Sequence, residues 1–292
     1  MSGLVGAAPV GYSARHTLSV RVELIRQLRR RRTLVAYLLV VALPLVVVAA
    51  VKLGPQSNAS GGGGGFGGGN LDLVGLATTG AWNFTVTMLL FASGLLLVVL
   101  AALFLGDTVA SEASWSTLRY LLAAPVPRRR LLATKAIVGL MLTLGVLLTL
   151  VVTSLVVGLL AFGSTGLTSP TGGSFGAPES LQRVAIVTAY VAITLLIPAG
   201  VAFLMGVLTD VPLGAVGSAV MIVIVSTILD RLEPLGDLRR LLPTNYGSAW
   251  ADALGSDVVW GQMATGAAYA CVTFALMATL AALRFERKDI VS

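Results

Sequence analysis

The chain has 292 residues, of which 56% are hydrophobic and only 11% are charged. Soluble domains of this size keep about a quarter of their residues charged, so the composition excludes an ordinary soluble domain and indicates that the bilayer is the solvent. The net charge of +7 would suit nucleic-acid binding, but the arginines stand beside apolar runs, as topology signals do. We therefore expect the lipid bilayer as a partner and no nucleic acid.

Residues 1–16 precede any patterned segment, and we expect them to be disordered. Residues 17–32 combine arginines with apolar residues at helical spacing, which predicts an amphipathic helix lying in the membrane interface. Its apolar stripe consists of Leu18, Leu24, Ile25 and Leu28. The helix leads directly into the first apolar run, which we interpret as an uncleaved span and not as a signal peptide.

Six apolar runs are long enough to cross a bilayer, because a spanning helix needs roughly 20 apolar residues. The predicted spans are residues 33–51, 80–106, 132–162, 183–208, 213–229 and 260–283. Continuous apolar runs favour helices over barrel strands, in which apolar and polar residues alternate. Residues 17–292 are therefore predicted to form one all-α integral membrane domain, with Pro212 opening the fifth span after a tight turn.

The basic residues predict the orientation of the spans. Fifteen of the twenty lysines and arginines belong to the N-terminal segment, to the loop after the second span with its flanks, or to the C-terminal segment. An even number of spans puts these three regions on one side, and the positive-inside rule identifies that side as the cytoplasm. We expect both termini to be cytoplasmic.

Three loops then fall on the outer side. The glycine-rich stretch 61–69 follows no strand and precedes no Gly-Lys-Ser/Thr, so we expect a flexible linker and not a phosphate cradle. The second loop, 163–180, is rich in Gly, Ser, Thr and Pro. The third loop, 230–259, mixes apolar, aromatic and polar residues, and we expect it to pack against the membrane surface or partly to re-enter it.

The cytoplasmic loop 107–130 is a polar interruption between two apolar runs. Asp107 can cap a helix whose first turns either continue from the second span or restart after Gly106. Glu112 and Arg119 fall on one helical face with Ser116, and the helix should end before Pro125. Two interpretations stay open, an interfacial helix without a partner and a docking helix for a soluble partner. We favour docking, because membrane adhesion does not need both charges.

The sequence lacks chemistry that would power a membrane protein by itself. It has no Walker motif, and His16 and Cys271 are its only histidine and cysteine, which leaves no disulfide framework and no thiolate metal cluster. The acids next to the spans lie at their ends, at Asp107, Asp210, Asp230 and Glu286. Ion-coupled transporters usually carry ionisable groups within their spans. We therefore expect no catalytic residue, metal or cofactor in this chain, and an outside source of energy.

Several motifs occur in a characteristic order along the chain. They are Glu112, Ser116-Thr117-Leu118-Arg119, Leu121-Leu122, Pro125-Val126-Pro127-Arg128, Lys135, Leu242-Pro243, Trp250 and the segment 284–290. With the six spans and the amphipathic helix, this order resembles the permease subunits of ABC-2 type transporters over nearly the whole chain. Ser116 departs from the family, which frequently has glycine at this place; both residues are small.

The resemblance implies an exporter subunit in a bacterial cell membrane. Its N-terminal amphipathic helix would be the elbow helix, its 107–130 helix the coupling helix, and its third outer loop partly re-entrant. Two copies of a cytosolic ABC ATPase subunit would bind ATP and Mg²⁺, and a second permease subunit, identical or homologous, would complete the pathway. An uncharged pathway would suit an amphipathic or lipophilic substrate such as a drug, a lipid or a secondary metabolite.

The resemblance also implies roles for particular residues. The ATPase-coupling residues would be Glu112, Trp115, Leu118 and Arg119. The second and fifth spans would line the pathway, with candidate residues Asn83, Thr87, Ser218, Met221 and Thr227. The alternative function is a polytopic membrane scaffold or assembly protein without a transport cycle, and an intramembrane enzyme is the third possibility.

Overall fold

The computed structural model describes residues 19–53, 73–114, 128–168, 173–209, 211–255 and 257–287. Within these ranges every regular element is a helix, apart from an isolated bridge between Thr168 and Ser174. The predictions of a disordered segment 1–16 and of a glycine linker at 61–69 fall outside the described residues.

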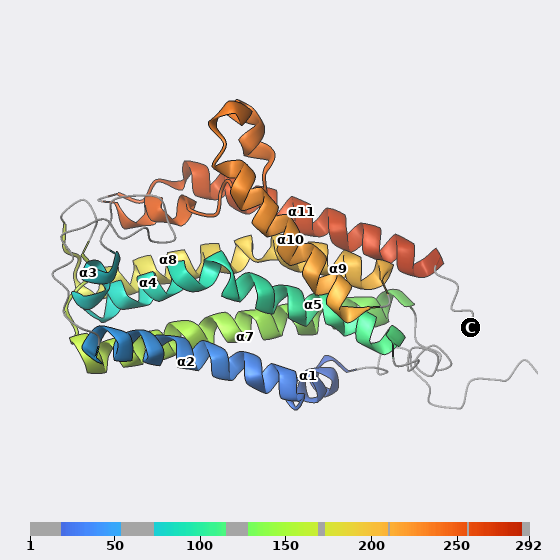
Figure 1. Ribbon diagram of the computed structural model, residues 1–292, viewed down its shortest axis with the longest axis horizontal. Coiled ribbons are helices and arrows are strands. Elements are labelled where there is room, and N and C mark those ends of the chain that lie inside the picture. Colours follow the sequence, from blue (N-terminus) through green and yellow to red (C-terminus); the bar gives the residue numbers. More distant parts are fainter. Residues whose placement is uncertain are drawn as a thin grey trace, which may run out of the picture.

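The helices form an elongated bundle (Figure 1). The longer helices are α2 (Arg31–Leu53), α4 (Ala81–Gly94), α5 (Leu96–Ser114), α7 (Arg128–Phe162), α8 (Ala177–Thr194), α9 (Leu196–Leu208), α10 (Pro212–Asp230) and α11 (Trp260–Arg287). The short elements are α1 (Val20–Leu28), α3 (Leu73–Thr78), η1 (Glu233–Leu241) and η2 (Ala249–Leu254). We call the two ends of the bundle the α1 end and the α3 end.

The described helices confirm the predicted all-helical fold class. Five helical segments are long and apolar enough to cross a membrane: α2, α7, α8 with α9, α10 and α11. A sixth follows if α4 and α5 are one span bent by 54°. The six coincide with the six predicted apolar runs. The fold is thus compatible with a multi-pass membrane protein, and Pro212 opens α10 as expected.

Two of the predicted spans are broken, which the apolar pattern did not indicate. Span two ends its first helix at Gly94, where glycine weakens the helix and nothing packs against the missing side chain. Span four breaks at Leu195 between α8 and α9. Pro198 explains this break, because its ring lacks the N–H and crowds the carbonyl of Thr194 four residues earlier.

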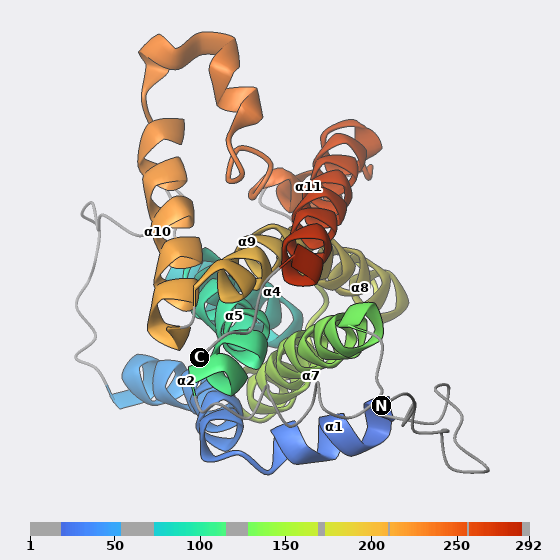
Figure 2. The ribbon, with the colours of Figure 1, turned by 90° about the vertical axis from the view of Figure 1, so that its right-hand side faces the viewer.

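Helix α5 occupies the centre of the bundle and packs against α7, α9 and α10 (Figure 2). Helices α5 and α9 approach closely at Gly106 and Gly206, because a Cβ on Gly206 would collide with the carbonyl oxygen of Gly106. Small residues let two helix backbones touch, which is the usual packing of helices in lipid. Helix α11 covers the other side of α9.

Helix α2 lies on the periphery and exposes most of its apolar surface. Its buried positions form one narrow stripe, consisting of Thr33, Ala36, Val40 and Pro44. Large apolar side chains cover the remainder, among them Leu34 and Val46, each 62% exposed. A soluble protein rarely leaves so large an apolar face open, whereas a helix facing lipid requires one.

The long connection between α10 and α11 folds back along the bundle. Tyr269 of α11 donates a hydrogen bond to the carbonyl of Leu241 at 2.8 Å, and Tyr190 of α8 donates one to the carbonyl of Tyr246 at 2.7 Å. With a rise of 1.5 Å per residue, these tyrosines lie about 14 and 20 Å from the starts of their helices. Residues 241–246 therefore lie beside the helices and not beyond their ends.

The same connection is anchored again at the α3 end. Arg183 of α8 is 4% exposed and donates hydrogen bonds to the carbonyls of Ala253 and Gly255 at 2.7 and 2.6 Å. Its guanidinium also lies 3.9 Å from the centre of the Phe175 ring. The planar, multiply donating guanidinium thus joins the segment after η2 to the start of α8.

Candidate functional site

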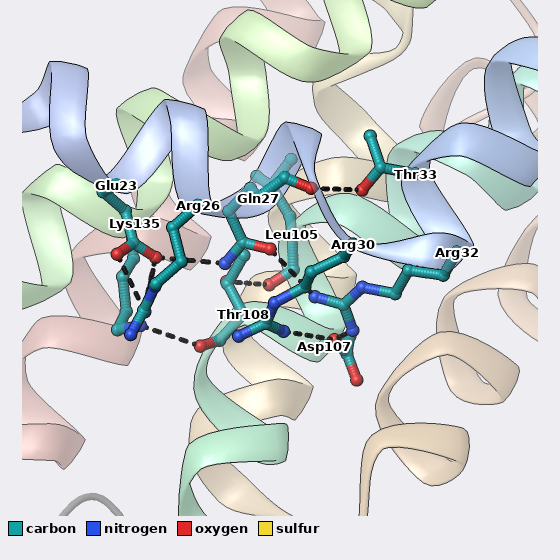
Figure 3. A network of polar contacts seen from close by, with 10 residues as sticks. All are labelled: Glu23, Arg26, Gln27, Arg30, Arg32, Thr33, Leu105, Asp107, Thr108 and Lys135. Carbon is teal, nitrogen blue, oxygen red and sulfur yellow. Dashed lines mark hydrogen bonds and ion pairs between the residues drawn. The ribbon is translucent and has the colours of Figure 1, made fainter.

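A polar cluster with a buried centre lies near the α1 end, where α1, α2, α5 and α7 meet (Figure 3). We call it the α1-end cluster. Its members are Glu23, Arg26, Gln27, Arg30, Arg32, Thr33, Asp107, Thr108 and Lys135. Polar side chains that are buried together are rare among apolar helices, and they must satisfy one another.

Lys135 and Glu23 form one half of the cluster. Lys135 is 2% exposed, and its ammonium lies 3.8 Å from the Glu23 carboxylate and donates a hydrogen bond to the Thr108 carbonyl at 3.1 Å. Glu23 also accepts hydrogen bonds from Gln27 at 3.0 Å and from Arg26 at 2.8 Å. These contacts tie α1 to both α7 and α5.

Asp107 forms the second half. Its carboxylate is paired with Arg32, and the Arg30 guanidinium lies 3.9 Å away. Arg32 also donates a hydrogen bond to the Gln27 amide oxygen at 3.1 Å, which joins the two halves. Asp107 lies inside α5, which continues through Gly106 to Ser114, so the prediction that Asp107 caps a helix is wrong.

Helix α1 turns its polar side to the bundle. Its buried residues are Glu23 and Gln27, whereas Val22, Ile25 and Leu28 are 67%, 42% and 43% exposed. Two residues of the predicted apolar stripe, Ile25 and Leu28, therefore face away from the protein, where an interfacial helix meets lipid. The face of α1 turned to the bundle carries Glu23 and Gln27, because Glu23 pairs there with Lys135.

The electrostatics of the cluster keep Glu23 ionised. Burial by itself raises the pKa of this carboxyl, because desolvation penalises its charged form. The charge of Lys135 and the hydrogen bonds from Arg26 and Gln27 outweigh that effect, so the pKa of Glu23 falls below its usual value. Glu23 is therefore a compensated negative charge at neutral pH.

The cluster brackets the segment that connects α5 to α7. Helix α5 ends at Ser114 and α7 begins at Arg128, so Asp107 and Lys135 each lie about two turns from the connection. A further ion pair joins Arg129 of α7 to Glu286 of α11. These polar contacts link the two flanks of the connection to α1, α2 and α11. Among the described residues, no group of three His, Cys, Asp or Glu could hold a metal ion.

The predicted coupling residues lie at the edge of what the structure describes. Glu112 belongs to the last turn of α5. Trp115, Leu118 and Arg119 lie outside the described residues, as does the predicted helix end at Pro125.

The predicted pathway residues do not converge on one opening within the chain. Asn83 and Thr87 are 1% and 3% exposed, and the Asn83 side-chain oxygen accepts a hydrogen bond from the Thr168 backbone at 3.1 Å. Ser218 and Thr227 donate hydrogen bonds to carbonyls of their own helix, α10. Met221 is 60% exposed on that helix. Asn83 thus braces the loop after α7, while α10 presents its residues outward.

Sequence analysis missed the most connected polar residues of the site. Glu23, Gln27 and Lys135 come from segments that it treated as topology anchors or as part of a motif. One signal was present: Glu23 is the only acid in the basic segment 17–32. A lone acid there opposes the positive-inside pattern, so it indicates a specific cationic partner.

Comparison with known proteins places the chain in a family. Residues 70–291 match the family described as "Protein of unknown function (DUF2705)". Because the match covers most of the chain, the protein belongs to this family. No curated protein matches the sequence.

Proposed function

Starting from a family without an assigned activity, we propose that this chain is the membrane subunit of an ATP-driven exporter of the ABC-2 type. In this proposal the α1 end faces the cytoplasm of a bacterial cell, and α1 is the elbow helix. The connection between α5 and α7 docks into a separate ABC ATPase subunit, which supplies ATP, Mg²⁺ and the hydrolysis. Two permeases and two ATPases form the working unit.

The observation that carries the proposal is the α1-end cluster. A connection that only bridged two spans would not require buried charges on both of its flanks, because burying charge is costly unless the charge is paired. Here Asp107 on one flank and Lys135 on the other are paired with α1 and α2. Such a network holds the flanking helices together as one unit, as a lever needs when a partner moves it.

The composition of the spans supports an amphipathic or lipophilic substrate. The described spans keep their acids near their ends, and the pathway candidates on α4 and α10 are neutral. A route lined by neutral groups does not compensate a substrate charge, whose burial in the bilayer is expensive. The partly re-entrant connection between α10 and α11 fits the same family resemblance.

The test begins with the ABC ATPase whose gene neighbours this one. The two proteins are co-expressed, purified together in lipid nanodiscs and assayed for substrate-stimulated ATP hydrolysis. We expect Glu112→Ala combined with Arg119→Ala to abolish co-purification or to uncouple hydrolysis from transport. The matched control is Lys52→Ala combined with Asp257→Ala, which removes one base and one acid at exposed positions of the other end.

Two results would overturn the proposal. One is that no ABC ATPase co-purifies with the wild-type chain, which would favour a scaffold or assembly protein. The other is that the Glu112 and Arg119 substitutions leave assembly, stimulation and transport into inverted vesicles at the level of the control.

A further inference from the structure

We propose that residues 231–241, which include η1, form a docking arm for a second copy of this chain. The inference rests on the proposed membrane function only in requiring that the helices span a bilayer. Figure 1 shows the arm projecting sideways from the bundle, between its two ends, and Figure 2 shows it arching from α10 towards α11.

The arm lies at a depth that belongs to the hydrocarbon core. Its last residue, Leu241, is hydrogen-bonded to Tyr269, about 14 Å along α11 from its outer end. The predicted span 260–283 is about 35 Å long, and the hydrocarbon core that it crosses is about 30 Å thick. The level of Tyr269 is therefore well inside the bilayer.

The arm is unsuited to lipid at this depth. Asp237 and Arg240 pair with each other at 3.2 Å but stay 89% and 74% exposed, and the backbone turns at Gly236 with a φ of 50°. Irregular backbone and charged groups within the bilayer are tolerated only where protein or a water-filled cavity covers them. Leu238 and Leu241 are 63% and 68% exposed, and they offer apolar surface against which a covering protein could pack.

A polar recess under the arm needs the same cover. Its volume is about 830 Å³, and it lies between the end of α10, the arm and the first turns of α11. Its lining includes Asp230, Asp237, Arg239, Asn245, Gln262 and Thr265. Polar walls of this kind hold water, which lipid on the open side would exclude. A protein wall on that side would complete a closed, wet chamber.

A second copy of the chain supplies that wall with matching chemistry. The arm carries both signs of charge, with Glu233 and Asp237 as acids and Arg239 and Arg240 as bases. A two-fold axis places the same surface on both subunits, so the acids of one arm can meet the bases of the other. The leucines would then pack between the arms, and the two recesses would join into one chamber at the outer half of the membrane.

Cross-linking of single cysteines tests the docking arm. Cys271 is the only cysteine, so Cys271→Ala gives a cysteine-free chain, to which Leu238→Cys is added. A short bis-maleimide is applied to native membranes. The control is Val46→Cys on the lipid-facing side of α2, which is 62% exposed. We expect a covalent dimer with Leu238→Cys and only monomer with the control.

Charge exchange provides the second measurement. Dimer dissociation is followed in nanodiscs by dilution and single-molecule photobleaching. Asp237 and Arg240 balance each other within one arm, so Asp237→Arg or Arg240→Asp alone gives both arms an excess of the same charge. We expect either change to weaken the dimer by about tenfold through repulsion between the arms, and the double exchange, which restores the balance, to restore the dimer. Full water accessibility of Leu238→Cys without cross-linking would overturn the inference, as would quenching of a fluorophore there by spin-labelled lipid.

The outcomes separate this inference from the exporter proposal. A dimer through the arm without any ATPase partner would support the inference while the proposed function fails. An ATPase-coupled exporter in which Leu238→Cys never cross-links would leave the proposed function standing and overturn the docking arm.

Discussion

Removal of the Lys135 ammonium should destabilise the protein by a predictable amount. Lys135→Met keeps the volume and the apolar stem, but it leaves Glu23 buried at 6% exposure without its nearest fully buried cation. Breaking a buried pair on one side costs about 3–5 kcal/mol. Arg26 and Gln27 still contact the carboxylate, so we expect a value at the lower end, about 3 kcal/mol.

The cost of Lys135→Met should fall when Glu23 is neutralised as well. Glu23→Gln combined with Lys135→Met leaves no unpaired charge on this side of the cluster. For residues in contact, the coupling in such a double-mutant cycle is about 0.5–3 kcal/mol, and we expect about 2 kcal/mol here because both side chains are buried.

The assay is thermal unfolding in nanodiscs, followed by tryptophan fluorescence. For a chain of this size, 1 kcal/mol corresponds to about 2–3 °C in Tm, so Lys135→Met should lower Tm by about 6–9 °C. The double variant should recover about 4 °C relative to the sum of the two single effects. The exposed Lys52→Gln serves as a control without effect. Strict additivity of Glu23→Gln and Lys135→Met would refute the pairing of α1 with α7.

Three further predictions concern the pH dependence, the helix packing and the α3 end. Because the pKa of Glu23 is lowered in the folded state, its ionised form contributes stability at neutral pH, and this stability is lost as pH falls through that lowered pKa, below 4.5. The Tm measured from pH 7 to pH 3 should therefore fall further for the wild type than for Glu23→Gln. Parallel Tm curves for the two proteins would contradict this. Gly206→Ala should destabilise the protein by about 1–3 kcal/mol, because the added Cβ meets the Gly106 backbone. Gly217→Ala, whose added Cβ meets nothing within 4 Å, should be neutral or should stabilise by up to about 1 kcal/mol. Equal Tm values for the two variants would refute the close approach of α5 and α9. Arg183→Lys should destabilise the protein by about 1–3 kcal/mol, because an ammonium cannot reach the Ala253 and Gly255 carbonyls and Glu179 together. Faster proteolysis after residue 250 would report that the connection between α10 and α11 has loosened. An unchanged cleavage rate would argue against the anchor.

The apolar runs and prolines were sufficient to predict the six spans and the start of α10. In a bilayer each helix satisfies its own backbone hydrogen bonds, so a span is decided locally by twenty or so consecutive residues. The outward-facing apolar residues Ile25 and Leu28 of α1 could be anticipated from the same kind of local pattern. The breaks at Gly94 and Leu195 could not, since glycine and proline are also tolerated within unbroken spans.

The polar site depended on tertiary structure. Glu23, Asp107 and Lys135 are far apart in the chain, and each alone reads as an ordinary charge near the end of a helix. Only the packing of α1 and α5 on α7 brings Lys135 to Glu23 and to the Thr108 carbonyl beside Asp107, and buries the three charges. Likewise, the hydrogen bonds of Tyr190 and Tyr269 place residues 241–246 beside the helices. Sequence determined which segments are helical and apolar, because those properties are local; structure decided which charges meet, because that requires the relative positions of four helices.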